Sequence, residues 1–335
     1  VRKHGLVFLN EIGLDPGIDH MSAMEVIDRI RAKGGKMLLF ESFTGGLVAP
    51  ESDTNLWNYK FTWNPRNVVL AGQGTVKFIQ EGRYKYYPYH RLFPRTEMIY
   101  LPDYGYFEGY ANRDSLKYLH VYGLEDIRTL YRGTLRRPGF CKAWNIFVQL
   151  GATDDTYELE GVRGMTHRQF LNSFLSYDPH NSIELKLAHY LKLDLAGAEM
   201  FKLKWLGLFS DELVGLEKGT PAQILEHILK KSWTIQPDDK DMIVMWHKFD
   251  FLDQGKPRQV ESYMVRKGRN ATHTAMSETV GLPLGIAAKM VLMGKISETG
   301  VHIPVKPGIY HPILNELATV GMEFVEREME LDLAK

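Results

Sequence analysis

A short polar turn near the start of the chain carries the residues best placed to do chemistry. The apolar run Leu6–Leu9 leads into Gly13-Leu14-Asp15-Pro16-Gly17, and Asp19 opens a segment with helical periodicity. Pro16 disfavours the helical region for Asp15, and Asp19 can cap the helix that follows. Open α/β folds present ligand sites where a strand ends in such a turn. We therefore expect the Asp15 carboxylate to face a cleft, with an ordinary helix cap as the alternative.

Four arginines are candidates for binding an anion. Arg113 lies in a tight polar loop, and Arg132, Arg136 and Arg137 cluster in a β-prone segment. A planar guanidinium meets a carboxylate with two parallel hydrogen bonds, which favours arginine in sites for acidic substrates. A solvated surface position is the alternative for each of them, and we expect it for Arg132 and Arg137.

Other chemical signatures are missing from the sequence. Its 12 histidines are scattered without an HExxH pattern, and Cys141 is the single cysteine, so we expect no metal site and a buried thiol. The run Gly281–Lys289 lacks the ending of a phosphate-binding loop. No Ser/His/Asp set can be assigned.

Composition limits the partners and the compartment. The chain has 335 residues, of which 44% are hydrophobic and 24% charged, enough for two or three soluble domains. Lys and Arg (41) balance Asp and Glu (41), so we expect neither a nucleic acid nor a membrane as partner. No apolar run approaches the roughly 20 residues that a membrane helix needs. One cysteine allows no intrachain disulfide, which favours a reducing, cytoplasmic compartment.

Hydrophobic periodicity predicts alternating helices and strands. A helix over 19–33 followed by a strand over 36–42 resembles part of a βαβ unit, and the tyrosine-rich stretch 60–130 favours a mixed or antiparallel sheet. Two strands over 242–249 and 260–266 form a hairpin. The predicted helices span 142–150, 167–174, 183–191, 195–206, 221–231, 281–293 and 312–330.

This pattern predicts an α/β protein: the closing portion of a Rossmann-like dinucleotide domain, joined to a mixed-sheet substrate domain with a helical insert. Residues 1–34 end the incomplete Rossmann-like domain, and 35–139 with 232–267 form the mixed-sheet substrate and dimerisation domain. Residues 140–231 form the helical subdomain. Residues 268–335 supply helices that return toward the dinucleotide domain.

Seven sequence blocks resemble saccharopine dehydrogenase of the glutamate-forming type. They run from about residue 9 to about residue 315, in the order and spacing of that family. The blocks are Asn10–Met21 (NEIGLDPGIDHM), Phe43–Glu51, Tyr59–Trp63, Gly109–Ser115, Tyr131–Arg136, Lys240–Met245 and Thr279–Pro283. One departure is Thr44, which stands where better-known members have a cysteine and argues against a mechanism that needs a thiol there.

The resemblance implies an oxidoreductase of lysine metabolism that acts on a C–N bond. Saccharopine, NAD(P)+ and water would give aminoadipate semialdehyde and glutamate, or the reverse. The resemblance implies that Leu14, Asp15 and Pro16 contact the NAD or NADP cofactor, with Asp15 also a candidate proton carrier. Arg113 and the group Thr134, Leu135 and Arg136 would contact the substrate.

The general base stays open among Asp15, Asp114, Tyr110 and a residue outside this chain. We expect the guanidinium groups of Arg113 and Arg136 to converge beside the Asp15–Pro16 bend.

The glycine-rich dinucleotide fingerprint of such enzymes does not occur in this sequence. We therefore expect the 335 residues alone to show no saccharopine oxidation, and we expect a homodimer. Two alternatives remain. One is a reductive condensing enzyme of the carboxynorspermidine or homospermidine synthase type, which joins an amine to an aldehyde. The other is a non-catalytic ligand-binding or dimerisation module.

Overall fold

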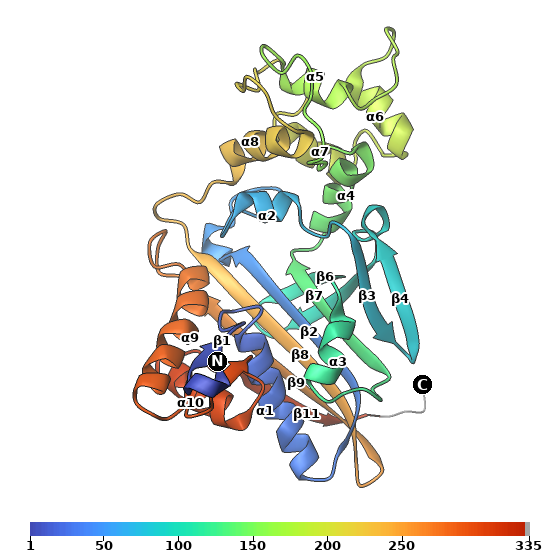
Figure 1. Cartoon of the computed structure of the whole chain (residues 1–335). Helices are drawn as coiled ribbons and strands as arrows, with labels where there is room; N and C mark the ends of the chain where they lie inside the picture. Colours follow the sequence, from blue (N-terminus) through green and yellow to red (C-terminus); the bar gives the residue numbers. More distant parts are fainter. Residues whose placement is uncertain (332–335) are drawn as a thin grey trace.

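A mixed β-sheet forms the centre of the computed structural model, which describes residues 1–331 (Figure 1). Its strand order is β11-β9-β8-β2-β7-β3-β4, and the β5–β6 hairpin joins it at β7. The strands are β2 (Lys36–Val48), β3 (Thr75–Gln80), β4 (Arg83–Pro88), β5 (Thr96–Leu101), β6 (Gly105–Ala111), β7 (Thr129–Arg136), β8 (Asp241–Asp253), β9 (Lys256–Lys267) and β11 (Val325–Glu330).

The two central strand pairings set which side chains share a face. Strand β2 runs parallel to β7 and antiparallel to β8, so Thr44 lies opposite both Thr134 and Met245. Because directly opposite residues point to the same side of a sheet, Thr44 and Thr134 share one face. We call this the inner face; it also carries Ser42 and its partner Arg132.

Three helices cover the inner face: α1 (Ile18–Ala32), α9 (Ala275–Leu292) and α10 (Pro307–Thr319) (Figure 1). Buried apolar side chains of α1, such as Met21 and Ile27, pack in one cluster with Phe40 of β2 and Phe249 of β8. Burying this surface supplies the main stabilising free energy and fixes the start of α1 against the sheet. The start of α1 is where the Asp15 turn joins it.

A separate helical lobe lies beyond one end of the sheet (Figure 1). It consists of α4 (Phe140–Leu150), α5 (His167–Asn172), α6 (Ile183–Leu191), α7 (Ala198–Trp205) and α8 (Pro221–Trp233). A reciprocal capping box, in which Thr220 and Gln223 satisfy each other's backbone N–H groups, begins α8. Buried aromatic rings join the lobe to the sheet, with Trp57 and Trp233 at a centroid distance of 5.2 Å.

The remaining elements are short: β1 (Val7–Leu9), α2 (Pro65–Val69), α3 (Tyr118–Val121) and β10 (Gly300–His302). Strands β1 and β10 form a separate two-stranded parallel sheet. Its side chains Phe8 (54%) and Val301 (57%) are more than half exposed. Three-residue strands with exposed apolar side chains contribute little stability by themselves.

Most predicted elements occur, and the α/β class with a mixed sheet is confirmed. The predicted helix over 312–330 is wrong in its second half, because α10 ends at Thr319 and 325–330 form edge strand β11. Gly321, with a φ of +77°, lies between the two elements. The side chain of Arg258 on β9 binds Glu328 across the pair at 2.8 Å. Pairing with β9 outweighs the helical pattern of this acidic segment.

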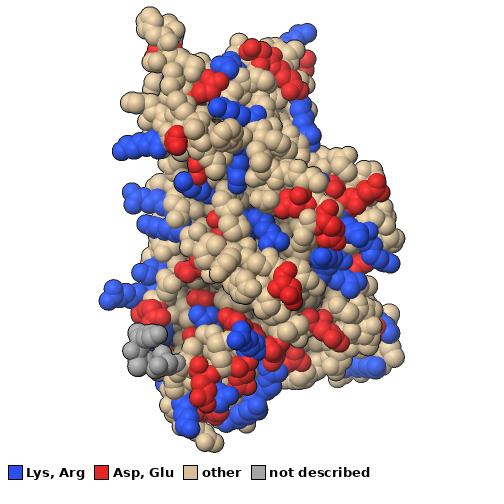
Figure 2. All heavy atoms as spheres, turned by 180° about the vertical axis from the view of Figure 1, so that it is seen from behind, with Lys and Arg blue, Asp and Glu red and all other residues tan. Residues whose placement is uncertain are grey.

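Among residues 1–331, α9 is the one helix whose length and composition would allow it to cross a membrane. Core helices of other proteins meet the same criterion, and α9 packs on β8 and α10 with Pro283 and Ile286 buried. Seen from behind, the molecule shows acidic and basic side chains intermixed over its surface (Figure 2).

Candidate active site

The turn between β1 and α1 fixes Asp15 beside the start of the helix. The Gly13 N–H donates to the Pro16 carbonyl at 3.1 Å, and the Asp15–Pro16 peptide bond is cis. Gly17 has a φ of +152°, and a Cβ there would lie 2.0 Å from the Gly13 carbonyl oxygen. Only glycine fits this close approach. The turn leaves the Asp15 side chain about 25% exposed, while Leu14 is buried.

Arg132 of β7 reaches across to this turn. Its Nη2 donates to Asp15 Oδ1 at 3.0 Å and also to Asp19 Oδ2. The Arg132 side chain is only 11% exposed, and its guanidinium carbon lies 4.1 Å from the centre of the Tyr118 ring. The expected surface position for Arg132 is therefore wrong. The parallel pairing of β2 with β7 places Arg132 on the inner face, and local sequence does not reveal that pairing.

A second set of buried groups lies behind Asp19. His20 is fully buried, its Nε2 lies 2.6 Å from Glu11 Oε2, and its Nδ1 lies 2.6 Å from the Tyr122 hydroxyl. His20 Nδ1 is also 3.9 Å from Asp19 Oδ2. Glu11, His20 and Tyr122 were not predicted as site residues from the sequence. The adjacency of Asp19 and His20 after the turn was an available signal; for Tyr122 there was none.

The two aspartates differ in their electrostatic surroundings. Burial and the charge of Asp19 raise the pKa of the Asp15 carboxyl, against the opposing effect of Arg132. Burial alone would also raise the pKa of Asp19, but His20, Arg132 and the Gly17 N–H together lower it. The Gly17 N–H donates to Asp19 Oδ1 at 2.6 Å. Of the pair, Asp15 is the carboxyl that more readily holds a proton.

A polar strip extends from this turn along the inner face of β7. Because side chains alternate along a strand, Arg132, Thr134 and Arg136 point to the same side. At about 3.3 Å per residue, Arg132 and Arg136 are separated by roughly 13 Å along the strand. Thr44 lies opposite Thr134, and its hydroxyl is buried without a hydrogen-bond partner in the described chain. The proximity of Thr44 lowers the pKa of the Asp15 carboxyl. The strip therefore joins Asp15 to the helical lobe.

Arg136, at the far end of the strip, is a buried cation that forms no ion pair within residues 1–331, although the buried Glu108 lies opposite it on β6 and raises its pKa. Its side chain is 3% exposed, Nη1 donates to the Leu135 carbonyl at 2.9 Å, and Nε has no partner among residues 1–331. The guanidinium carbon lies 5.0 Å from the Tyr59 ring centre and 5.4 Å from that of Phe140. Three more buried polar atoms without partners belong to Tyr59, Thr62 and Trp233.

The predicted substrate-binding residues are only partly brought together. Thr134 and Arg136 both lie on the strip. The Leu135 side chain points to the other face of the sheet, where its Cβ is so close to Gly45 that a Cβ at residue 45 would lie only 2.8 Å away. Arg113 is exposed, with a φ of +52°, and lies two residues beyond the pairing of Ala111 with Gly133. The arginine that contacts Asp15 beside the Asp15–Pro16 bend is Arg132, which was not among the predicted substrate-binding residues.

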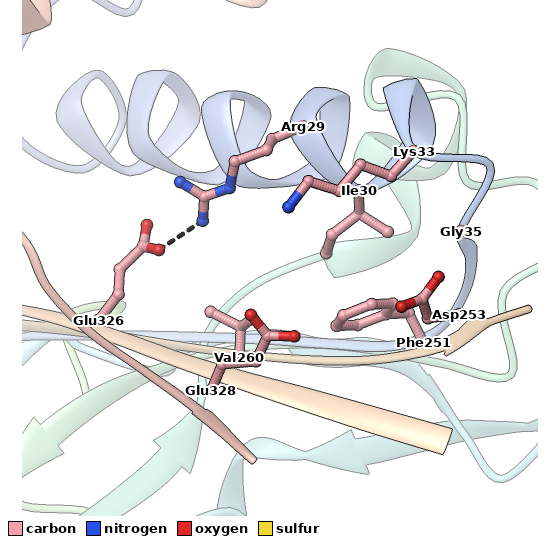
Figure 3. Close-up of a pocket in the computed structure, with 9 residues that line it drawn as sticks. All are labelled: Arg29, Ile30, Lys33, Gly35, Phe251, Asp253, Val260, Glu326 and Glu328. Carbon is pink, nitrogen blue, oxygen red and sulfur yellow. Dashed lines mark hydrogen bonds and ion pairs between the residues drawn. The ribbon is translucent and has the colours of Figure 1, made fainter. Parts of the chain in front are cut away.

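A separate cavity of about 280 Å³ lies between the end of α1 and the sheet (Figure 3). Basic side chains Arg29 and Lys33 extend from α1, acidic Glu326 and Glu328 come from β11, and the ion pair between Arg29 and Glu326 crosses it. None of the residues predicted from the sequence lines this cavity. Among residues 1–331, no group of three or more His, Cys, Asp or Glu side chains could hold a metal ion.

Comparison with known proteins identifies the family. The family model "Saccharopine dehydrogenase C-terminal domain" matches residues 13–322. The mitochondrial alpha-aminoadipic semialdehyde synthase of Rattus norvegicus is 36% identical over 327 residues, covering 96% of this chain and 35% of that protein. Saccharopine dehydrogenase [NADP(+), L-glutamate-forming] of Saccharomyces cerevisiae is 32% identical over 323 residues, covering 94% of this chain and 72% of the yeast protein.

A solved structure agrees with these matches. The structure of apo histidine-tagged saccharopine dehydrogenase (L-Glu forming) from Saccharomyces cerevisiae aligns with a TM-score of 0.87 at 30% identity. The alignment covers 98% of this chain and 75% of the yeast chain. The present chain spans about a third of the length of the synthases it matches. It belongs to the family of the saccharopine dehydrogenase C-terminal domain.

Proposed function

We propose that this chain binds saccharopine as the substrate-binding part of an NAD(P)-dependent saccharopine dehydrogenase. The observation that carries the proposal is the buried guanidinium of Arg136, which forms no ion pair within the described chain, because the buried Glu108 carboxylate opposite it on β6 accepts the Cys141 N–H instead. A buried charge without a counter-ion is strongly unfavourable. An anionic group of a ligand would supply the close ion-pair partner that Arg136 lacks, and Tyr59, whose buried hydroxyl has no partner among residues 1–331, lies beside it.

The length of the strip supports a long ligand. Saccharopine joins the lysine side-chain nitrogen to the glutamate α-carbon, and it carries carboxylates at both ends. Ten bonds connect the lysine-derived carboxyl carbon to the distal carboxyl carbon of the glutamate part. At the extension of a polypeptide, in which three bonds span about 3.5 Å, this path measures roughly 12 Å. The strip between Arg132 and Arg136 measures roughly 13 Å.

Asp15 is the proton acceptor in the proposed reaction. The ligand's secondary ammonium loses one proton before its nitrogen lone pair can form a C=N bond, and the Asp15 carboxylate takes that proton. The neighbouring C–H carbon gives up a hydride, for which the nicotinamide cofactor is the acceptor. Water then adds to the resulting iminium carbon, and cleavage yields aldehyde and amine. A carboxyl whose pKa is raised is the better base near neutral pH.

The chain's residues fit only one end of a nicotinamide cofactor. The backbone of Leu14, Asp15 and Pro16 borders the proton-transfer position, so we assign the nicotinamide ring to this turn. The pyrophosphate of such cofactors rests on a glycine-rich turn and a helix start, a pattern missing from these 335 residues. The choice between NAD and NADP depends on residues that follow that pattern. The homodimer and the cytoplasmic location remain predictions from the sequence.

Isothermal titration calorimetry with saccharopine tests the proposal. We expect the wild-type chain to bind, and Arg136→Met to weaken binding at least about tenfold, because it removes the charge while keeping the bulk. Arg137→Met is the matched control, since Arg137 donates to the Tyr104 carbonyl and does not face the strip. Carboxynorspermidine, titrated in parallel, tests the condensing-enzyme alternative. No saccharopine binding by the folded wild type, or equal affinity in Arg136→Met, would refute the proposal.

A further inference from the structure

Asp15 and Asp19 share a single cationic nitrogen. Arg132 Nη2 donates to both carboxylates, and no other Lys or Arg within the described chain forms an ion pair with either. The arginine is itself held from two sides, since the Tyr118 ring covers its guanidinium and the Ser115 hydroxyl accepts its backbone N–H at 3.1 Å. Two negative groups therefore depend on one immobilised positive group.

The two carboxylates are not equivalent in geometry. Asp19 is 1% exposed, accepts the Gly17 N–H at 2.6 Å and lies in the first turn of α1, where the helix dipole favours an anion. Asp15 is 25% exposed and precedes the turn into the helix. The hydrogen bonds and the helix start thus hold Asp19 as an anion, whereas Arg132 is the one side chain among residues 1–331 that donates a hydrogen bond to the Asp15 carboxylate.

Further groups connect Asp19 to the surface. His20 Nε2 lies 2.6 Å from Glu11 Oε2, and this contact lowers the pKa of Glu11, so the imidazole donates to an ionised carboxylate. Glu11 is 34% exposed and adopts a φ of +55°, a conformation unfavourable for a residue with a Cβ. Tyr122, Tyr118 and His247 complete the titratable groups around the pair, and His247 Nε2 lies 2.8 Å from the Ser22 hydroxyl.

We propose that Arg132 is a positioning residue, which holds Asp15 beside the start of α1 and uses the fixed charge of Asp19 to make Asp15 the proton-accepting member of the pair. This inference rests on the proposed function for its catalytic meaning. The contacts and charges of Arg132, Asp15 and Asp19 from which it is argued are features of the unliganded chain. The guanidinium stays charged and aims the Asp15 oxygens. The anion of Asp19 raises the affinity of Asp15 for a proton.

Two substitutions predict opposite shifts in the titration of Asp15. Replacing Arg132 with Gln removes the cation, so the Asp15 pKa should rise by about one unit or more. Asp19→Asn removes the neighbouring anion and leaves Arg132 to Asp15 alone, so the pKa should fall by a similar amount. Arg137→Gln should leave it unchanged. The measurement is the pH dependence of the Asp15 carboxyl carbon signal in the 13C NMR spectrum of the chain without ligand.

Opposite signs would support the proposal, and shifts in the same direction would overturn it. A general loss of structure would move Asp15 toward the ordinary aspartate value of about 3.9 in both variants. If Arg132→Gln fails to fold, Asp19→Asn still decides, because an unchanged or raised Asp15 pKa in that variant contradicts the proposal. Saccharopine is not needed for this titration, so its result is independent of the calorimetric test of the proposed function.

Discussion

At the scale of single residues, the Asp15 turn requires glycine at position 17, because a side chain does not fit there. Gly17→Ala would place a Cβ 2.0 Å from the Gly13 carbonyl oxygen at a φ of +152°. The turn must then open, and we expect a loss of about 2–4 kcal/mol of unfolding free energy together with weaker saccharopine binding. Urea denaturation and calorimetry measure the two effects.

Gly281→Ala is the matched control for this substitution. A Cβ at Gly281 in α9 meets no atom within 4 Å, so alanine there should be neutral or should stabilise the chain by about 0.5–1 kcal/mol. A Gly17→Ala variant as stable as wild type would show that the turn is not locked by close backbone contact.

The same scale shows how far sequence alone could identify the site. Asp15, Pro16 and Gly17 could be recognised because the strand, the turn and the helix are contiguous, so local rules apply. Arg132 could not, because its role depends on pairing with a strand about 90 residues earlier, a separation that follows from the register of Ser42 with Arg132. Arg136 and Thr134 came from the family resemblance, and the structure adds that Arg136 is buried and forms no ion pair among residues 1–331.

At the scale of elements, a partly buried charged pair connects β2 and β8. Glu41 lies directly opposite Lys248, with 4.0 Å between its Oε2 and the lysine Nζ. Burial raises the pKa of Glu41 to about 7 against the opposing charge of Lys248, and Glu97, Asp250 and Glu81 each add a smaller effect in the same direction as burial. Between pH 4.5 and 7 the folded chain therefore holds a proton that the unfolded chain has lost, so stability falls as the pH rises through this window.

Glu41→Gln should remove this pH dependence. At pH 8 the variant should be more stable than wild type by about 1–3 kcal/mol, since no buried charge has to form; at pH 5 the difference should be small. Urea denaturation at both pH values checks this. Glu323→Gln, at an exposed position, should change stability equally at both. A Glu41→Gln variant that loses stability only at pH 8 would mean that the ion pair with Lys248 is net stabilising.

Helices and strands were predicted correctly from the sequence where a single hydrophobic periodicity dominates the segment. The helix over 183–191 and the hairpin of β8 with β9 follow from local periodicity and turn residues. The prediction failed for 325–330, where glutamates alternate with other residues in an acidic segment that also suits a helix. The partner that decides this case is β9, through pairs such as Arg258 with Glu328 and Glu330. A strand formed by long-range pairing leaves only a weak signal in its own residues.

At the scale of the whole molecule, the strip lies between two differently built parts. Asp15 comes from the turn that leads into α1, whereas Arg136 lies where the sheet meets the helical lobe, beside Tyr59 and Phe140 (Figure 1). Both ends of a long substrate would thus be bound by elements that pack on the same sheet. The small β1–β10 sheet, by contrast, exposes the apolar side chains of Phe8 and Val301.

This arrangement predicts that the 335-residue chain binds the substrate but does not bind the nicotinamide cofactor. The strip is complete within it, so saccharopine should bind in the calorimeter without added nucleotide. The glycine-rich turn that would hold a pyrophosphate does not occur in the sequence, so NADH and NADPH should show no saturable fluorescence change, and saccharopine with NAD+ or NADP+ should give no absorbance increase at 340 nm. Steady turnover by this chain would mean that the turn at Leu14–Pro16 and its neighbours hold the whole cofactor.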